Sequence, residues 1–110
     1  MSETENIPSE EKPTEPREQE FPLPPVSFEF LTLSLRTQVE VQLGLLDLGE
    51  GGERPQPDLR LARHTLDLMA MLQEKTRGNL TIEEQRLLDN SLTELRFRYV
   101  QAVEDLKKKG

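Results

Sequence analysis

One stretch of the chain, residues 31–45, restricts the fold more than any other. Large apolar side chains occupy most of its odd positions, namely Leu31, Leu33, Leu35, Val39, Val41, Leu43 and Leu45. The even positions hold polar residues or glycine, namely Thr32, Ser34, Arg36, Gln38, Glu40, Gln42 and Gly44. Alternation with period two is typical of a half-buried β-strand. Taken by itself, the stretch favours a strand.

Two observations favour an α-helix for the same stretch. A strand of about fifteen residues is far longer than usual, and no other segment offers a partner for its backbone hydrogen bonds. On a helix, at about 100° per residue, the charged residues Glu29, Arg36 and Glu40 fall on one narrow strip with apolar residues on both sides. Ser27 is suited to cap the first turn. We therefore predict a helix over about residues 27–46.

A second helix is expected after a glycine- and proline-rich segment. Residues 47–57 contain three glycines and two prolines, which predicts a loop. The apolar pattern that follows predicts a helix over about residues 58–76. Gly78 fits a left-handed residue just beyond the end of that helix.

The third helix has the clearest local signal in the chain. Thr81 with Glu84 three residues later forms a capping box, which predicts a helix over about residues 81–107. Its expected inward stripe is Leu88, Leu92, Leu95, Tyr99, Ala102, Val103 and Leu106. The short connection between the last two helices predicts that they pair as an antiparallel hairpin.

The first 25 residues differ in composition from the rest. They hold six of the eight prolines, and seven glutamates against Lys12 and Arg17, which gives a net charge of −5. Only two apolar residues precede Phe21, so the segment cannot bury enough surface to offset the entropy cost of ordering. We expect a disordered, acidic, proline-rich tail at residues 1–25, followed by one all-α domain at residues 26–110.

Composition excludes several classes of function. The whole chain carries 14 Lys and Arg against 21 Asp and Glu, a formal net charge of −7. This balance argues against a general nucleic-acid binder and against docking on anionic lipid. The absence of cysteine excludes disulfides and thiolate sites, and a single histidine, His64, excludes His-rich metal sites. Without cysteine or a signal peptide at the start, the expected location is the cytoplasm.

No group of residues has the spacing of a catalytic site. The glycines at 49–52 lack the Lys-Ser or Lys-Thr pair and the preceding strand of a phosphate-binding loop. His64 beside Asp67 could act as a general base, but no serine or threonine is placed to be its nucleophile. Capping and the helix dipole explain Glu83 and Glu84. We therefore expect no enzyme, no catalytic or metal-binding residues and no cofactor.

The first helix has more apolar surface than a three-helix monomer can cover. Each helix needs one apolar stripe toward the core, and this one offers a second arc beyond its charged strip. We predict that a symmetric homodimer buries this arc, because two-fold pairing is the commonest closed assembly. The proposed self-association residues are Phe30, Leu33, Val41 and Leu45. The alternative is a monomer in which a loop or residues 21–26 cover the arc.

These features predict a small cytoplasmic helical protein that works by self-association and by contact with other proteins. The alternative is an RNA- or ribosome-associated factor that would use Arg96, Arg98 and Lys107–Lys109, with Phe97 between the two arginines for stacking. Adjacent acidic residues and the negative net charge argue against nucleic acid as a partner, and no membrane partner is expected.

Short motifs along the three expected helices resemble one known family. They are Ser27-Phe28, Phe30-Leu31, Ser34-Leu35, Leu43-Gly44, Asp58-Leu59, Ala62-Arg63, Asp67-Leu68, the run from Leu72 to Glu84, Leu95-Arg96 and Tyr99-Val100. Together they resemble the bacterial domain-of-unknown-function family DUF1844 over roughly residues 27–103. The stretch from Glu74 to Glu84 is the most specific part. The resemblance implies a short, soluble, helical protein, and it implies no activity, substrate or catalytic residue.

Overall fold

The computed structural model describes residues 22–46 and 56–109 of the 110-residue chain. Three α-helices lie in these ranges: α2 spans Phe28–Gln42, α3 spans Leu59–Lys75 and α4 spans Ile82–Lys109. The stretch with alternating polarity forms α2, and the described ranges contain no β-strand. The prediction of an all-α fold with three helices is therefore confirmed.

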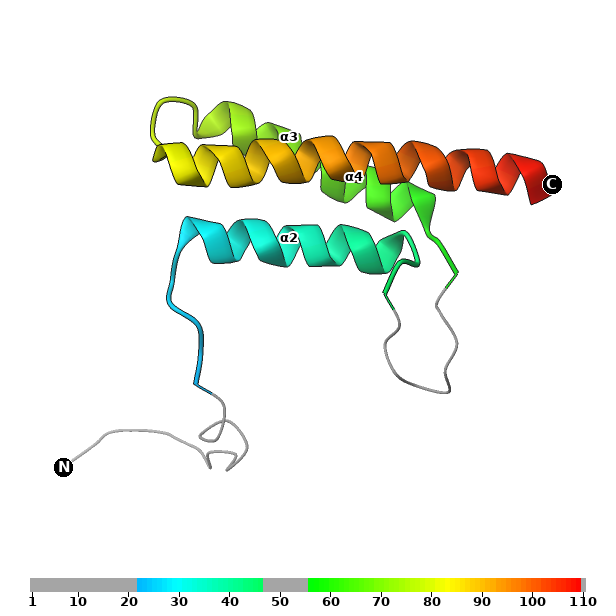
Figure 1. The fold of residues 1–110 in the computed structure, drawn as a ribbon, viewed down its shortest axis with the longest axis horizontal. Coiled ribbons are helices and arrows are strands. Elements are labelled where there is room, and N and C mark those ends of the chain that lie inside the picture. Colours follow the sequence, from blue (N-terminus) through cyan, green and yellow to red (C-terminus); the bar gives the residue numbers. More distant parts are fainter. Residues whose placement is uncertain (1–21, 47–55, 110) are drawn as a thin grey trace.

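Two predictions concern residues outside the described ranges. The disordered tail predicted at 1–25 lies outside them as far as Phe21, and the loop predicted at 47–57 lies outside them from Asp47 to Pro55. The described segment before α2, Pro22–Val26, contains neither helix nor strand, and its residues are exposed. It leads into α2 from outside the bundle (Figure 1).

Side chains just before each helix determine where the helix begins. Ser27 has extended backbone angles of φ −151° and ψ 159°, and its hydroxyl accepts a hydrogen bond from the amide of Phe30 at 3.0 Å. Asp58 caps α3 in the same way. Thr81 and Glu84 exchange both hydrogen bonds of the predicted capping box, at 2.8 and 3.1 Å. Each cap pairs an amide group that the first turn leaves without a partner.

The chain reverses its direction between α3 and α4 (Figure 1). Gly78 in this turn has a φ of 83°, in the left-handed region that residues with a side chain avoid. All three helices touch one another, with α4 running back beside α3 and α2 alongside (Figure 1). The amide of Gln73 donates to the carboxylate of Asp89 at 2.7 Å, which links α3 to α4.

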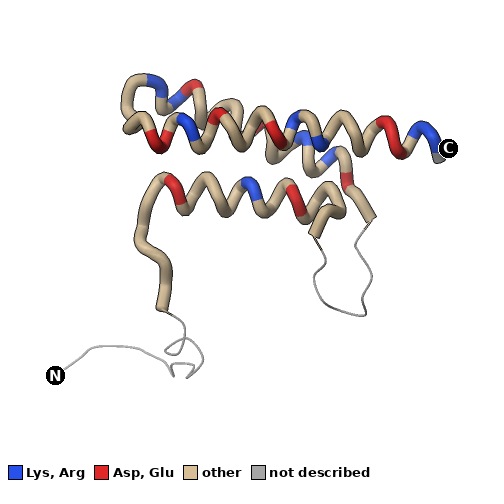
Figure 2. The backbone as a smooth tube through the Cα atoms, in the orientation of Figure 1, with Lys and Arg blue, Asp and Glu red and all other residues tan. Residues whose placement is uncertain are grey.

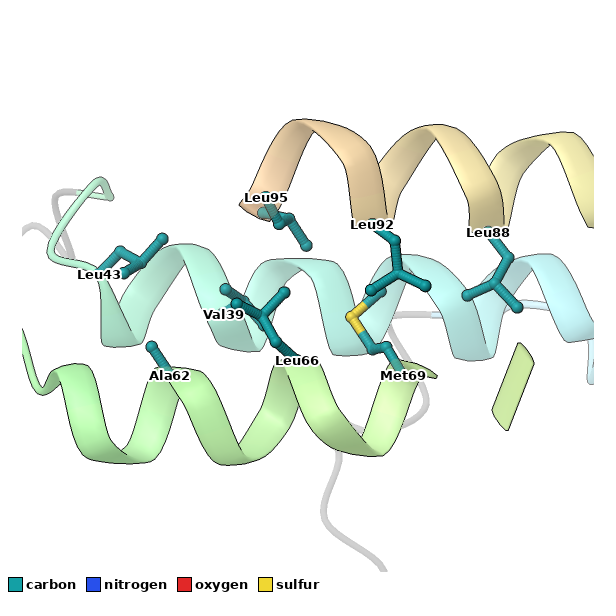
Figure 3. Packing of buried hydrophobic residues seen from close by; sticks show 8 residues of the cluster. All are labelled: Val39, Leu43, Ala62, Leu66, Met69, Leu88, Leu92 and Leu95. Atoms are coloured by element: carbon teal, nitrogen blue, oxygen red, sulfur yellow. The ribbon is translucent and has the colours of Figure 1, made fainter. Parts of the chain in front are cut away.

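The hydrophobic core lies where the three helices meet. Figure 3 shows its eight buried side chains, which are Val39, Leu43, Ala62, Leu66, Met69, Leu88, Leu92 and Leu95. Three polar residues, Thr32, Thr65 and Ser91, are buried as well. The three hydrophobic core residues of α4, Leu88, Leu92 and Leu95, all belong to its predicted inward stripe, whereas the sequence pattern did not indicate the three buried polar residues.

Leu31 of α2 and Leu106, which belongs to the predicted inward stripe of α4, are both exposed. Leu31 is 43% exposed because α2 turns Thr32 and Val39 to the core, which places Leu31 about 90° away around the helix. Leu106 is 45% exposed. α4 has 28 residues against 15 in α2 and 17 in α3, so its last turns extend past both partners (Figure 1).

Candidate protein-contact site

Arg36, in the middle of the charged strip of α2, contacts α4. The guanidinium of Arg36 donates to the carboxylate of Glu94 at 2.7 Å, to Glu40 at 3.3 Å and to the hydroxyl of Ser91 at 3.4 Å. Arg98 approaches the same Glu94 at 3.8 Å from the next turn of α4. Figure 2 marks the basic and acidic residues along the backbone of the helices. Arg36 therefore forms a polar contact between α2 and α4, and Glu40 supports it from the same helix.

The environment of Arg36 keeps this contact charged. Partial burial disfavours the charged guanidinium and by itself lowers its pKa, but hydrogen bonds to Glu94 and Glu40 outweigh burial, so the net pKa of Arg36 is raised. A raised pKa on a base contributes stability that is fully present below the pKa of the unfolded chain, which for an arginine lies far above neutral pH. The arginine side of the contact therefore does not titrate near neutral pH.

The face of α2 that points away from the core carries no charge. The residues more than about 100° from the core direction are Phe30, Leu33, Ser34, Thr37, Gln38 and Val41. Phe30 is 47% exposed and Leu33 is 45% exposed. Ser34 donates its hydroxyl to the carbonyl of Phe30 at 2.9 Å, so this polar group is paired within the helix. We call this surface the outer face of α2, and its lack of charge matches the centre of protein–protein interfaces.

The structure divides the four predicted self-association residues into two pairs. Phe30 and Leu33 are exposed in the first half of α2. Val41 is half-buried, and Leu45 is half-buried against the core. The amide of Asp58 donates to a carbonyl at the end of α2 at 2.7 Å, so the returning chain lies close to that end. The accessible part of the predicted site is therefore its N-terminal half.

The two arginines of the RNA alternative lie on different flanks of α4. Both are exposed, but residues two apart on a helix are separated by about 200°. Arg98 also lies next to Glu94. Phe97 points in a third direction and is 62% exposed. The helix thus does not gather Arg96, Phe97 and Arg98 on one surface.

A cavity of about 550 Å³ at the start of α3 contains the only histidine of the chain. His64 is exposed there, and the carboxylate of its neighbour Asp67 is paired with Arg63 at 3.4 Å. The carboxylate of Asp67 is therefore engaged by Arg63 and is not positioned to orient the imidazole of His64. In the described ranges, no three His, Asp or Glu side chains are grouped to hold a metal ion.

A second cavity, of about 350 Å³, lies where the end of α2 meets α4. We call it the α2-end cavity. Its apolar lining is Leu43, Leu45, Pro57, Ala102 and Leu106, and its polar lining includes Gln56, Arg98, Gln101 and Asp105. Sequence reasoning missed this cavity because its walls come from three separate segments, none of which has a motif of its own.

Comparison with family models matches residues 25–101 to a domain of unknown function, DUF1844. The chain belongs to the DUF1844 family. The matched residues contain α2, α3 and most of α4, in agreement with the motifs in the sequence. Comparisons with curated proteins and with solved structures find no match. None of the helices in the described part of this DUF1844 chain has the length and apolar character needed to cross a membrane.

Proposed function

We propose that this DUF1844 chain is a non-enzymatic contact protein that self-associates through the outer face of α2. The orientation of α2 carries the proposal. Arg36 bonds to Glu94 of α4 and to Glu40 of its own helix, while the exposed side of α2 is uncharged and presents Phe30 and Leu33. A helix on the surface of a monomer normally turns its charged residues to water. On α2 the arrangement is the opposite, because Arg36 faces α4 and the side exposed to solvent is uncharged. A helix at an interface between two protein chains requires such an uncharged exposed side.

The charge of the chain favours a second copy as the partner of this face. With a net charge of −7, two copies repel each other over much of their surfaces. The outer face of α2 lets two copies approach without placing like charges together. Two-fold pairing then buries the same residues of both copies, and this is the commonest closed arrangement.

The apolar side chains of this region support a weak dimer. Full burial of a Leu or Phe side chain is worth about 1.5–3 kcal/mol. Phe30 and Leu33 on this face, and Leu31 beside it, are already about half-buried, so each can gain only about half of that value. The loss of translational and rotational freedom on association offsets much of the gain. The dimer should therefore form and separate with protein concentration.

Sedimentation equilibrium of the full chain tests the proposal. The mass is expected to rise from 12.7 kDa toward twice that value as the concentration increases from about 10 µM to about 1 mM. A mass of 12.7 kDa throughout would contradict it.

Paired variants locate the interface. The double variant Phe30→Glu, Leu33→Glu is expected to remain monomeric with unchanged helix content by circular dichroism, because it places charges on an exposed face. Ile82→Glu is the matched control, since Ile82 is equally exposed but lies on α4. Ile82→Glu should dimerise like the parent chain.

A further inference from the structure

The extended segment before α2 exposes two large apolar side chains. We call this segment, Pro22–Val26, the arm. Leu23 is 89% exposed, and Val26 is fully exposed. Three of its five residues are prolines, which restrict the backbone and favour a polyproline II conformation. Binding such a segment costs little conformational entropy, and its prolines have no N–H groups that need partners. The arm is suited to an apolar site that supplies hydrogen-bond donors.

The α2-end cavity has that chemistry. Its lining combines apolar residues with the side chains of Arg98 and Gln101, which are hydrogen-bond donors, and with the carboxylate of Asp105. A polyproline II backbone makes no internal hydrogen bonds, so its carbonyls are free to accept from such donors. At about 350 Å³ the cavity is at the small end of ligand sites, which suits a few apolar side chains of a peptide.

The arm and the cavity of one copy lie at opposite ends of α2. These ends are about 22 Å apart for a helix of 15 residues, and the arm leads away from the bundle (Figure 1). Antiparallel pairing of two outer faces brings the first residues of one α2 beside the last residues of the other. Parallel pairing would place two N-terminal segments side by side, each with a net charge of −5 over residues 1–25. Charge repulsion therefore favours the antiparallel pair.

We propose that the arm of each copy binds the α2-end cavity of the other copy. Leu23 and Val26 then contact the apolar lining residues, among them Leu45 and Leu106, and Arg98 donates to a carbonyl of the arm. The inference rests on the self-association proposed above. The exchanged arms add apolar contact that the outer face of α2 does not supply by itself.

Cross-linking between introduced cysteines tests the exchange, because the chain contains no cysteine of its own. A Leu23→Cys chain is mixed with a Leu106→Cys chain that carries a size tag, and the mixture is mildly oxidised. The control mixture pairs Leu23→Cys with Ile82→Cys, which lies at the other end of α4. Since a disulfide forms only between Cα atoms within about 7 Å, the mixed dimer should form at least about ten-fold faster in the first mixture.

Two results would overturn the exchange. One is equal cross-linking of both mixtures. The other is rapid disulfide formation within single chains of a Leu23→Cys, Leu106→Cys double variant under dilute conditions, since the arm would then occupy the cavity of its own copy.

A second variant separates this inference from the proposed function. Leu23→Asp with Val26→Asp should weaken dimerisation about ten-fold in sedimentation equilibrium with no loss of helix, because both residues precede α2. An unchanged dimer constant would overturn the exchange and leave self-association standing. A parent chain that is monomeric at every concentration would overturn both.

Discussion

α2 and the pair formed by α3 and α4 are held in place by different kinds of contact. The turn between α3 and α4 depends on neighbours in sequence, namely Gly78 at positive φ and the capping box that begins at Thr81. α2 depends on residues more than fifty positions away, because Arg36 bonds to Ser91 and Glu94. Local signals thus define the α3–α4 pair, whereas tertiary packing defines the orientation of α2. Substitutions at these long-range contacts should therefore destabilise the packing of α2 before they affect the α3–α4 pair.

Removal of a core side chain shared by all three helices should have the largest effect. Leu92→Ala is expected to lower the free energy of unfolding by about 2–5 kcal/mol, because Leu92 is fully buried and a cavity remains. Urea unfolding followed by circular dichroism measures the change. Leu106→Ala is the control and should cost no more than about 1 kcal/mol, since Leu106 lies beyond the core. Equal losses would mean that α4 packs along its whole length.

Loss of the long-range polar contact should weaken α2 more than the α3–α4 pair. Arg36→Met is expected to cost about 1–2 kcal/mol, a figure reduced for the partial exposure of both Arg36 and Glu94. Hydrogen exchange should accelerate in α2 more than in α4. Arg63→Met is the matched control, because its pair with Asp67 is largely exposed and should contribute less than about 0.5 kcal/mol. Equal acceleration of hydrogen exchange in all three helices would show that the Arg36 contact does not hold α2 in particular.

A change in the turn should act locally. Gly78→Ala is expected to cost about 1 kcal/mol. A Cβ at this position would meet no atom within 4 Å, so the cost comes from the positive φ and not from a clash. Gly78→Asn should restore part of the loss in urea unfolding, because asparagine tolerates the left-handed region. Equal losses in the two variants would show that φ is not the cause.

The smallest expected effect is a gain in stability instead of a loss. Thr32 is fully buried on α2, and its hydroxyl oxygen has no hydrogen-bond partner among the described residues. Thr32→Val removes this unpaired polar group at similar volume, so it should raise the free energy of unfolding by up to about 1 kcal/mol. Urea unfolding measures the gain. A loss would show that the hydroxyl is paired in solution.

Patterns within a few residues of each other predicted much of the fold. The caps at Ser27 and Thr81 and the glycine at 78 define helix ends through local hydrogen bonds and backbone angles, and the structure contains all three. The leucines at 88, 92 and 95 were predicted as core because α4 has one clear apolar stripe. These features need no knowledge of the tertiary packing.

The orientation of α2 could not be predicted in the same way. The helical wheel placed Glu29, Arg36 and Glu40 on one strip with apolar residues on both sides, but a wheel does not show which direction faces the core. In the structure Arg36 contacts α4, and Thr32 and Val39 are buried on the side of α2 that faces the core. The candidate site is therefore the exposed side of the first half of α2 and not a band along the whole helix.

Fluorescence of a single tryptophan tests the central claim most directly, because the chain contains no tryptophan of its own. In a Phe30→Trp chain, the emission maximum should move to shorter wavelength as protein concentration rises, with the same midpoint as the increase in mass. A Phe97→Trp chain, with its probe on the exposed side of α4, should show no shift. Emission from Phe30→Trp that stays at the solvent-exposed wavelength while the mass doubles would show that the outer face of α2 is not where two copies meet.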